Sequence, residues 1–434
     1  MNLSPISHQE AIDFLYGLQR FGIKLGLRNI QRLLSVLGDP HREMKSIHIT
    51  GTNGKGSTAA MLESILRRAG YRTGLYTSPH LYRFGERIRV CGERIGDEKV
   101  TRFVEMMKPE VEALNCTFFE ATTALAMWHF ASESVDVAVL EVGMGGRLDA
   151  TNVVTPLASV ITNVSLEHCQ HLGADYRTIA EEKAGIIKEG TEVIAGNLVA
   201  AALEVIKDHS ARKNAPLHMA LDEVELQTKE LTREGTRFSC TSPEGHYEYL
   251  WIPLVGEHQI ENALLAIRSA EILREKGIRI SEDDIRAGLA SVEWPGRFQI
   301  VDSNPLTLLD VAHNPAAIYA VRRSIEEVLG VKRTVFVLGV MADKDYRGMI
   351  QALAPMAGLI IATQADMERA LEAEILGRCI AKEGVEYLIE PSPVEAYELA
   401  RSIARPGDLV CVTGSHFTVG EIMAKRCARK QTSR

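Results

Sequence analysis

A glycine-rich segment near the N-terminus has the composition of a phosphate-binding loop. Residues 48–58 read HITGTNGKGST, whereas the usual loop is G-x-x-x-x-G-K followed at once by serine or threonine. Here Gly56 follows Lys55, and the hydroxyl comes one position later, at Ser57. Such glycines let several backbone N–H groups point into one concavity, and the following helix start and the lysine add positive charge. The segment predicts a polyphosphate site; the alternative is a glycine-rich β–α turn with an exposed lysine.

A carboxylate ends a second apolar segment. Residues 135–153 read VDVAVLEVGMGGRLDATNV, in which the apolar run ends at Glu141. Ligands of open α/β sheets bind at the carboxyl edge of the strands, and magnesium prefers oxygen donors and keeps substrate phosphates among its ligands. We therefore interpret Glu141 as a magnesium ligand beside the phosphate loop; the alternative is a carboxylate that caps a loop. Gly143, Gly145 and Gly146 favour the first interpretation because they permit close approach of the backbone to a ligand.

These side chains need a parallel sheet to hold them at one edge. Strand-like runs alternate with helix-like stretches along most of the chain, which predicts an α/β fold with a mostly parallel, doubly wound sheet. Between about residues 215 and 255, the runs LHMALDEVELQ, TRFSCTSP and HYEYLWIPL predict a small antiparallel sheet. The strand-like runs of the parallel sheet are 46–50, 72–76, 136–142, 158–163 and 192–195.

A second series of α/β elements begins near Phe298. The segment EWPGRFQIVDSNP carries two prolines and a glycine, which places a linker near residues 296–299. We predict a phosphate-loop domain over 1–296 and a Rossmann-like α/β domain over 300–434. The strand-like runs of the second domain are 306–311, 334–338, 359–363, 387–389 and 409–413.

The bulk composition is that of an ordinary globular protein. The 434 residues are 46% hydrophobic and 24% charged, and the net charge of −8 without a basic stripe argues against a nucleic-acid partner. The basic end, IMAKRCARKQ, is interpreted as a short frayed tail. Seven scattered cysteines without a C-x-x-C pair indicate reduced thiols and a cytoplasmic protein. We expect no signal peptide, no spanning helix and no membrane partner.

Five segments together resemble the folylpolyglutamate synthase family, including its bifunctional dihydrofolate synthase form, within the Mur ligase superfamily. They occur in the family's order and span nearly the whole chain. The late hydroxyl is this family's own form of the loop, because its folate branch has glycine after the lysine. The five segments are GTNGKGS at 51–57, TSPHL at 77–81, EVGMGGRLDATN at 141–152, EKAGIIK at 182–188 and DVAHNP at 310–315.

The resemblance implies an ATP-dependent ligase. Such an enzyme joins L-glutamate to the carboxylate of a folate, and in the bifunctional form also of dihydropteroate, through an acyl phosphate. FGIKLGL at 21–27 and TFFE at 117–120 favour the bifunctional form. The expected partners are the small molecules ATP, L-glutamate, and dihydropteroate or a reduced folate, and we expect a monomer.

The resemblance also implies residues for the nucleotide and the metals. Arg297 would contact phosphate through its fixed donors, and Asp310 would accept from the ribose hydroxyls. Ser78 and Glu141 would bind one magnesium ion, and His168 a second. A potassium ion is a further candidate on which the sequence is silent. The expected nucleotide contacts are Gly51, Thr52, Asn53, Gly54, Lys55, Gly56, Ser57, Asn262, Arg297 and Asp310.

Lys183 is expected to carry a modification. An ordinary lysine is cationic and would repel magnesium, whereas the family converts the equivalent lysine into a carbamate with carbon dioxide. The alternative is a surface lysine that pairs with Glu181 or Glu182. Two positions depart from the family pattern, since Glu167 stands where aspartate is usual and Val311 where glycine is common.

The acid and amine substrates have their own candidates. His313 and Ser415 are expected to contact the incoming glutamate or the acyl phosphate, and His313, Lys55 and Lys183 are the candidate catalytic residues. Phe118 and Phe119 offer rings for stacking against a flat heterocycle, although from the sequence alone two core residues are the more common outcome. The folate-side candidates are Lys24, Leu25, Gly26, Leu27, Thr117, Phe118, Phe119, Glu120, Leu148, Asp149 and Ala150.

Three alternatives remain at this point. A cell-wall Mur ligase would normally place a separate substrate domain before the loop, which here begins at Gly51. A non-catalytic nucleotide-binding regulator would not need the second α/β domain. An enzyme performing only one of the two folate reactions would carry the same motifs.

Overall fold

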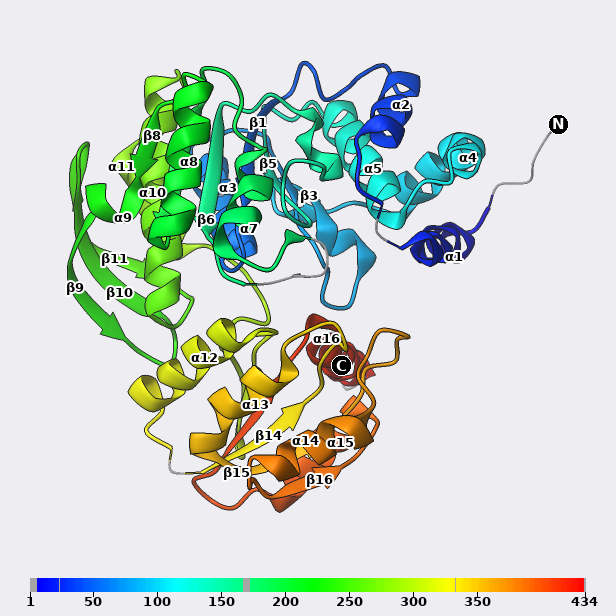
Figure 1. The fold of residues 1–434 in the computed structure, drawn as a ribbon, viewed down its shortest axis with the longest axis vertical. Coiled ribbons are helices and arrows are strands. Elements are labelled where there is room, and N and C mark those ends of the chain that lie inside the picture. The colour runs from blue at the N-terminus through cyan, green and yellow to red at the C-terminus, as the bar shows by residue number, and fades with distance from the viewer. Residues whose placement is uncertain (1–5, 23, 167–171, 332, 433–434) are drawn as a thin grey trace.

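The computed structural model describes residues 6–22, 24–166, 172–331 and 333–432, which form two lobes (Figure 1). The larger lobe is built on an eight-stranded sheet with the order β4-β3-β2-β5-β1-β6-β7-β8. From β2 to β8 neighbouring strands are parallel, and β3 and β4 add an antiparallel edge. The strands are β1 (Lys45–Thr50), β2 (Thr73–Tyr76), β3 (Ile88–Val90), β4 (Glu93–Arg94), β5 (Val137–Glu141), β6 (Ala158–Asn163), β7 (Glu192–Asn197) and β8 (Leu217–Met219).

Helices cover both faces of this sheet, as predicted. Side chains of β5 alternate between the faces: Val137 and Val139 join a core formed with α3, α10 and α11, whereas Ala138 and Leu140 join a core formed with α1, α2, α4 and α5. A third cluster lies under α7 and α8. The helices are α1 (His8–Gly17), α2 (Arg28–Val36), α3 (Lys55–Arg68), α4 (Asp97–Ala113), α5 (Phe118–Ser132), α7 (Tyr176–Ala184), α8 (Ala200–Arg212), α10 (Glu257–Glu275) and α11 (Glu282–Ala290).

The predicted small antiparallel sheet is present, but its first run was wrong in part. Its strands are β9 (Glu225–Leu231), β10 (Thr236–Ser242) and β11 (Gly245–Ile252). The run LHMALDEVELQ divides into β8, which extends the large sheet parallel to β7, a short helix α9 (Ala220–Glu223), and the start of β9. The division follows from burial, since Ala220 and Val224 both pack into the core beneath α10.

The second lobe is a six-stranded sheet with the order β12-β13-β17-β14-β15-β16. All neighbours are parallel except β12, which begins at the end of the predicted linker near 296–299 and forms a hairpin with β13. The strands are β12 (Gln299–Ser303), β13 (Leu306–Leu309), β14 (Thr334–Leu338), β15 (Ala357–Ala362), β16 (Tyr387–Ile389) and β17 (Leu409–Thr413). The helices are α12 (Pro315–Val328), α13 (Tyr346–Leu353), α14 (Ala373–Lys382), α15 (Pro393–Ile403) and α16 (His416–Thr432).

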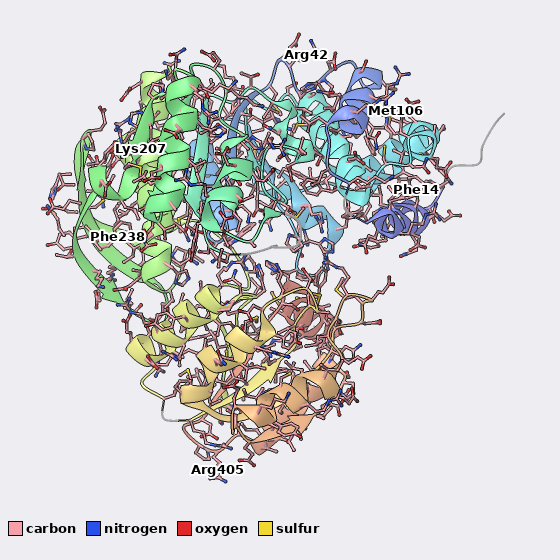
Figure 2. The ribbon with its side chains drawn as sticks, in the orientation of Figure 1. Phe14, Arg42, Met106, Lys207, Phe238 and Arg405 are labelled. Atoms are coloured by element: carbon pink, nitrogen blue, oxygen red, sulfur yellow. The ribbon has the colours of Figure 1, made fainter. Side chains whose placement is uncertain are left out.

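The C-terminal segment is helical rather than frayed. Helix α16 runs to Thr432, and Val419, Ile422 and Met423 on its inner side are buried against the second lobe. Side chains fill both lobes, while Arg42, Lys207 and Arg405 lie at the periphery (Figure 2). Among the described residues, none of the helices is long and apolar enough to cross a membrane.

Candidate active site

The phosphate-type loop joins β1 to α3, and sterics require each of its three glycines. Gly51 and Gly54 have φ values of 151° and 84°, which side chains rarely adopt. A Cβ at Gly51 would lie 1.8 Å from Oγ1 of Thr162, and a Cβ at Gly54 would lie 2.2 Å from Oδ1 of Asn262. A Cβ at Gly56 would lie 2.8 Å from the ring of Trp294. The glycine after the lysine therefore makes room for an indole of the inter-lobe connection.

The end of β6 holds the loop in shape. The Asn163 carbonyl accepts from the Thr52 amide at 3.0 Å, and its side-chain oxygen accepts from the Asn53 amide at 2.9 Å. Lys55 folds over the same loop, where Nζ donates to the carbonyls of Gly51 at 3.0 Å and Thr52 at 3.1 Å. The ammonium thus lies over the concavity of the loop, where it can meet an anionic phosphate.

Glu141 lies beside this loop. Strand register places it opposite Ile49 of β1, its side chain is 5% exposed, and Oε2 accepts from the Ser78 amide at 2.9 Å. Burial raises the pKa of Glu141, and the charge of Lys55 opposes that shift. A carboxylate and a hydroxyl residue so placed suit magnesium, which takes oxygen ligands. His168 lies outside the described residues.

Within the described part of the chain, no group of three or more His, Cys, Asp or Glu side chains is arranged to hold a metal. A cation beside Glu141 would therefore depend on few protein ligands and on substrate oxygens, as is usual for magnesium.

Lys183 is a buried residue, so its interpretation as a surface lysine is wrong. It is 3% exposed and lies near the end of α7. The two glutamates proposed as its surface partners are bound elsewhere, since Glu181 contacts His209 at 2.5 Å and Glu182 contacts Arg147 at 2.7 Å. A Cβ at Gly146 would lie 3.1 Å from the Lys183 carbonyl. The glycine segment after Glu141 therefore packs directly on α7.

Contacts across the two lobes meet at the loop. Asn314 of the DVAHNP segment donates through Nδ2 to Oδ1 of Asn53 at 2.8 Å. Arg297 lies within 3.4 Å of His416 Nε2, and burial lowers the pKa of Arg297 while Asp310 opposes the shift. The second lobe thus brings an asparagine to the nucleotide loop of the first, and the connection between the lobes places Arg297 where its charge acts on Glu141.

Asp310 and Asn262 are partly committed to the protein itself. Oδ2 of Asp310 accepts from the Phe298 amide and Oδ1 from the Ala312 amide, both at 2.8 Å. These bonds leave each oxygen one further lone pair. Asn262 donates to Gln259 Oε1 at 3.0 Å. The valine at position 311 is accommodated because its amide donates to the Gly296 carbonyl at 3.0 Å.

A cluster of rings lies between α1, α5 and the TSPHL segment. Phe118 stacks on Tyr16 with centroids 5.7 Å apart and an interplanar angle of 17°, and Phe84 meets Phe118 edge-on. Arg87 packs its guanidinium 5.0 Å from the Phe118 centroid and donates through Nε to Nδ1 of His80 at 2.7 Å. Phe118 is half-buried and packs against the core formed with α1, α2, α4 and α5, so it has one side in the core and one side accessible.

Four members of this cluster were missed from the sequence. Tyr16, Phe84 and Arg87 belong to no predicted motif, and His80 was noticed only as part of TSPHL. Phe119, also half-buried, packs near Gly143, where a Cβ would lie 2.5 Å from its ring. The rings converge only because α1 and α5 pack side by side on the sheet, which no local pattern indicates.

Several predicted folate-side residues also hold the backbone. Thr117 and Glu120 form the capping box of α5, in which Glu120 Oε2 accepts from the Thr117 amide at 2.7 Å. Asp149 is buried, and its carboxylate accepts from the Met144 amide at 2.9 Å. Leu148 accepts from the Gly26 amide at 3.4 Å through its carbonyl. The bond between Gly26 and Leu148 brings the predicted segments 21–27 and 148–150 together.

The other members of these segments differ in their exposure. Lys24 donates to the Asn115 carbonyl at 2.8 Å. Leu25 is 50% exposed, Leu27 is half-buried and Ala150 is buried. Leu25 is thus the most accessible apolar side chain among the described residues of the predicted covering loop.

His313 and Ser415 lie in the second lobe. Nδ1 of His313 is 3.0 Å from the Val311 carbonyl, and its ring lies 5.3 Å from that of His416. Ser415 is 2% exposed and accepts from the Thr418 amide at 3.0 Å, so its hydroxyl serves the first turn of α16. His313 is therefore the more accessible of the two for a substrate.

Comparison with known proteins identifies the family. Residues 49–270 match the Mur ligase middle domain, and residues 296–416 match the Mur ligase glutamate ligase domain. The chain belongs to the Mur ligase family. It is an ATP-dependent ligase, which excludes the non-catalytic alternative.

Relatives of this Mur ligase cover it almost end to end. It is 36% identical to the dihydrofolate synthase/folylpolyglutamate synthase of Bacillus subtilis, over 96% of this chain and 98% of the relative. Folylpolyglutamate synthase of Mycobacterium tuberculosis complexed with ADP and AMPPCP superposes with a TM-score of 0.89, 34% identity, and coverage of 98% and 99% of the two chains. FolC of Escherichia coli in complex with DHPP and ADP superposes with a TM-score of 0.88, 32% identity, and coverage of 99% and 100%.

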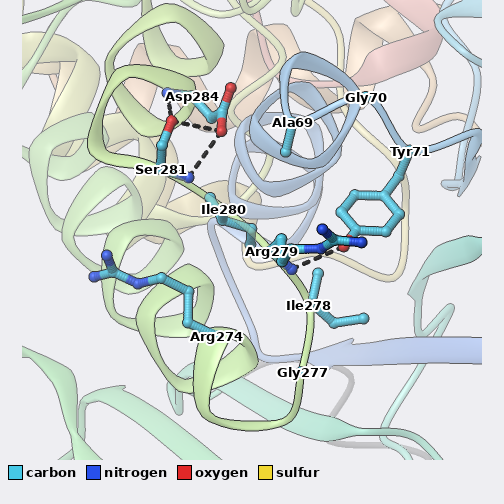
Figure 3. A pocket seen from close by; sticks show the side chains of 10 residues that line it. All are labelled: Ala69, Gly70, Tyr71, Arg274, Gly277, Ile278, Arg279, Ile280, Ser281 and Asp284. Carbon is cyan, nitrogen blue, oxygen red and sulfur yellow. Dashed lines mark hydrogen bonds between the residues drawn. The ribbon is translucent and has the colours of Figure 1, made fainter.

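The ligase also has a groove of about 710 Å³ at the far end of α3 from the phosphate loop (Figure 3). Several of its polar groups bond to one another, since the Arg279 amide donates to the Tyr71 hydroxyl at 2.8 Å and Ser281 and Asp284 form a capping box. Arg274 points its guanidinium away from Tyr71. Fourteen helical residues separate it from the loop, about 20 Å, so it takes no part in the candidate site.

Proposed function

We propose that this ligase joins L-glutamate to the carboxylate of a folate, and also to that of dihydropteroate, with conversion of ATP to ADP and phosphate. One observation carries the proposal: the nucleotide loop is hydrogen-bonded across the lobes to DVAHNP through Asn53 and Asn314, beside Glu141, which accepts from the Ser78 amide of the TSPHL segment. A site so arranged can hold a triphosphate, a flat acid and an amine together.

The reaction has two bond exchanges. A carboxylate oxygen of the acid bonds to the γ-phosphorus while the bond from that phosphorus to the oxygen of ADP breaks. The amine of glutamate then bonds to the acyl carbon, phosphate leaves, and the amine loses its proton. The first exchange needs position and charge neutralisation more than acid or base catalysis. Lys55 and Arg297 are suited to this because Lys55 lies over the loop and the charges of both act on Glu141 beside it.

The proposed magnesium ligands are Ser78 and Glu141 for one ion and His168 for a second. Bound magnesium would neutralise the oxygens of the γ-phosphate. A carbamate on Lys183 would supply a further negative oxygen ligand, and this residue is 3% exposed. A potassium ion remains a candidate.

The two lobes divide the work in this proposal. Residues 1–296 bind ATP and the acid. Residues 300–434 bring Asp310 to the ribose, and His313 and Ser415 to glutamate or the acyl phosphate. Arg297, which lies between the two ranges, contacts phosphate. The half-buried rings of Phe118 and Phe119 support a stacking role against the heterocycle. The proposed covering segments are Lys24, Leu25, Gly26 and Leu27, with Thr117, Glu120, Leu148, Asp149 and Ala150 framing the cleft.

The proposal includes a monomer in the cytoplasm. Six described cysteines are free, which supports a reducing compartment. Size-exclusion chromatography with light scattering would test the monomer directly.

One assay tests the function. Purified protein is mixed with ATP, magnesium, L-glutamate, and either dihydropteroate or tetrahydrofolate, and both ADP and the new amide are measured. We expect stoichiometric ADP and amide with both acids. Product with only one acid would restrict the enzyme to one reaction, and ADP without amide from either acid would contradict the proposal.

A further inference from the structure

Arg87 is a buried cation without an anionic partner. Its side chain is 7% exposed, and Nε donates to the neutral acceptor Nδ1 of His80 at 2.7 Å. Within the described part of the chain it forms no ion pair with a carboxylate. The two nearest carboxylates that act on it serve backbone amides instead: Glu86 accepts from Leu81 at 2.8 Å and Glu141 accepts from Ser78 at 2.9 Å.

An unpaired charge of this kind is costly to bury. Arginine cannot lose its proton in a protein, and an uncompensated buried charge destabilises the fold by several kcal/mol. A protein that keeps such a group usually pairs it with a ligand. The Nη groups of Arg87 remain available for this, since only Nε is committed to His80.

The position of Arg87 defines the ligand it would meet. On one side lies the Phe118 ring, which stacks on Tyr16, and both rings are only half-buried. On the other side its carbonyl accepts from the Thr77 amide at 2.9 Å, which ties Arg87 to the TSPHL segment beside Glu141 and the phosphate loop. A molecule that contacts both sides has an aromatic part and an anionic end directed at the phosphates.

We propose that Arg87 binds the carboxylate of the acid substrate and directs one of its oxygens at the γ-phosphate. The inference rests on the proposed function and deepens it. A guanidinium presents parallel donors that match a carboxylate in two-point contact. His80 fixes the rotation of that donor pair by accepting from Nε, and its own Nε2 lies 3.2 Å from the Tyr16 hydroxyl. Tyr16, His80 and Arg87 thus form one chain from the ring cluster to the reacting oxygen.

The test compares an acid with its uncharged counterpart. Binding of 7,8-dihydropteroate and of its carboxamide is measured for the wild type, Arg87→Met and Arg87→Lys. The matched control is Arg94→Gln, an exposed arginine on the neighbouring strand β4. We expect the wild type and the control to prefer the acid, and Arg87→Met to lose that preference with acid affinity and kcat/KM lowered roughly 10- to 100-fold. Arg87→Lys should keep part of the preference.

Two further readouts separate this role from others. Affinity for AMPPCP without any acid should stay within about twofold of the wild type; an equal loss of AMPPCP affinity would assign Arg87 to phosphate instead. The Tm of ligand-free Arg87→Met should equal or exceed that of the wild type, because the variant no longer buries an unpaired charge. A lowered Tm with equal loss of acid and carboxamide binding would make the role structural and overturn the proposal.

Wild-type ligation is measured first, so that the two ideas fail separately. If no folate acid yields an amide, the proposed function is contradicted. If ligation is normal and Arg87→Met keeps an undiminished preference for the acid, only the role of Arg87 is contradicted.

Discussion

Two arginines of this protein are buried to nearly the same extent in opposite surroundings. Arg268 of α10 is 5% exposed and Arg87 is 7% exposed. Arg268 donates to Glu223 at 2.6 Å and to Glu271 at 3.3 Å, and the fully buried Glu271 also accepts from the Tyr247 hydroxyl at 2.8 Å. Arg87 has a histidine nitrogen and a ring face as its contacts.

The pKa values of the two guanidinium groups shift in opposite directions. Burial tends to lower the pKa of Arg268, but Glu223 and Glu271 outweigh burial and raise it. Burial lowers the pKa of Arg87, and no partner outweighs it. Equal burial therefore does not imply equal roles. Where the protein supplies the counter-charge, as at Arg268, the arginine joins α9 to α10. Where the protein does not supply it, as at Arg87, the charge is available to a ligand.

The largest expected effect concerns Lys55 of the phosphate-type loop. Lys55→Ala should lower the rate of amide synthesis by roughly 10²- to 10³-fold or more, because a preorganised donor to the transferring phosphoryl group is lost. The change should leave stability within about 1 kcal/mol, since it removes only two solvent-accessible hydrogen bonds. Steady-state kinetics and urea unfolding measure both. Unchanged ATP-dependent ligation would overturn the loop assignment.

At Arg268 we expect the opposite result, a loss of stability with little change in activity. Arg268→Met leaves Glu223 and Glu271 without their cation, which should cost about 3–5 kcal/mol of unfolding free energy. The kcat of the folded fraction should stay near that of the wild type, because α9 and the small sheet lie away from the phosphate loop (Figure 1). Urea denaturation gives the first quantity and kinetics at low temperature the second. A large kcat loss in fully folded protein would break the comparison.

Lys183 is a third buried basic residue, and it tests whether the comparison between Arg87 and Arg268 extends to a lysine. If it is carbamylated, Lys183→Ala should lose roughly 10²-fold in activity, and added short carboxylates such as acetate should restore part of it. Mass spectrometry of the intact protein under carbon dioxide should show the added mass. Activity that is independent of carbon dioxide, with no rescue by carboxylates, would count against the modification.

The smallest expected effect concerns Glu192, a carboxylate that is paired with cations of the protein itself. Lys276 and His218 lower the pKa of Glu192 although burial opposes them. A depressed carboxyl pKa stabilises the fold above the unfolded value near 4.5, and the contribution disappears as pH falls through the folded pKa. Glu192→Gln should therefore cost about 0.5–1 kcal/mol at pH 7, a modest value because Lys276 is 38% exposed. The unfolding free energies of the two proteins should converge as pH falls through the lowered folded pKa of Glu192; a constant difference would contradict this assignment.

Short-range patterns were sufficient for much of the fold. The runs 334–338, 387–389 and 409–413 became β14, β16 and β17 with unchanged bounds. β14 and β17 are buried throughout, as continuous apolar runs between turns indicate, whereas β16 is an exposed edge strand. The pattern failed at β8 and β12. Whether such a segment becomes a strand depends on an open edge of another strand, and β7 and β13 supply those edges.

The candidate site also has a part that short-range sequence patterns predict and a part that they do not. The glycines of 51–57 and the carboxylate at Glu141 could be read from the sequence because each acts where its own strand ends. The roles of Thr117 and Ser415 as helix caps follow from local rules too, though we had assigned them to substrates. Arg87 could not be found this way, since arginines of similar context occur on both sides of it.

The sequence by itself determined where backbone turns, strands and helix starts fall, and from their order the α/β architecture and the nucleotide loop. These depend on interactions within a few residues of one another. Only the tertiary structure decided which buried cations find a protein carboxylate, as Arg268 does, and which are left for a ligand, as Arg87 is. The physical reason is that charge compensation acts over a few ångströms in space, and the partners of Arg268 lie on α9 and α10 through a fold that no local pattern contains.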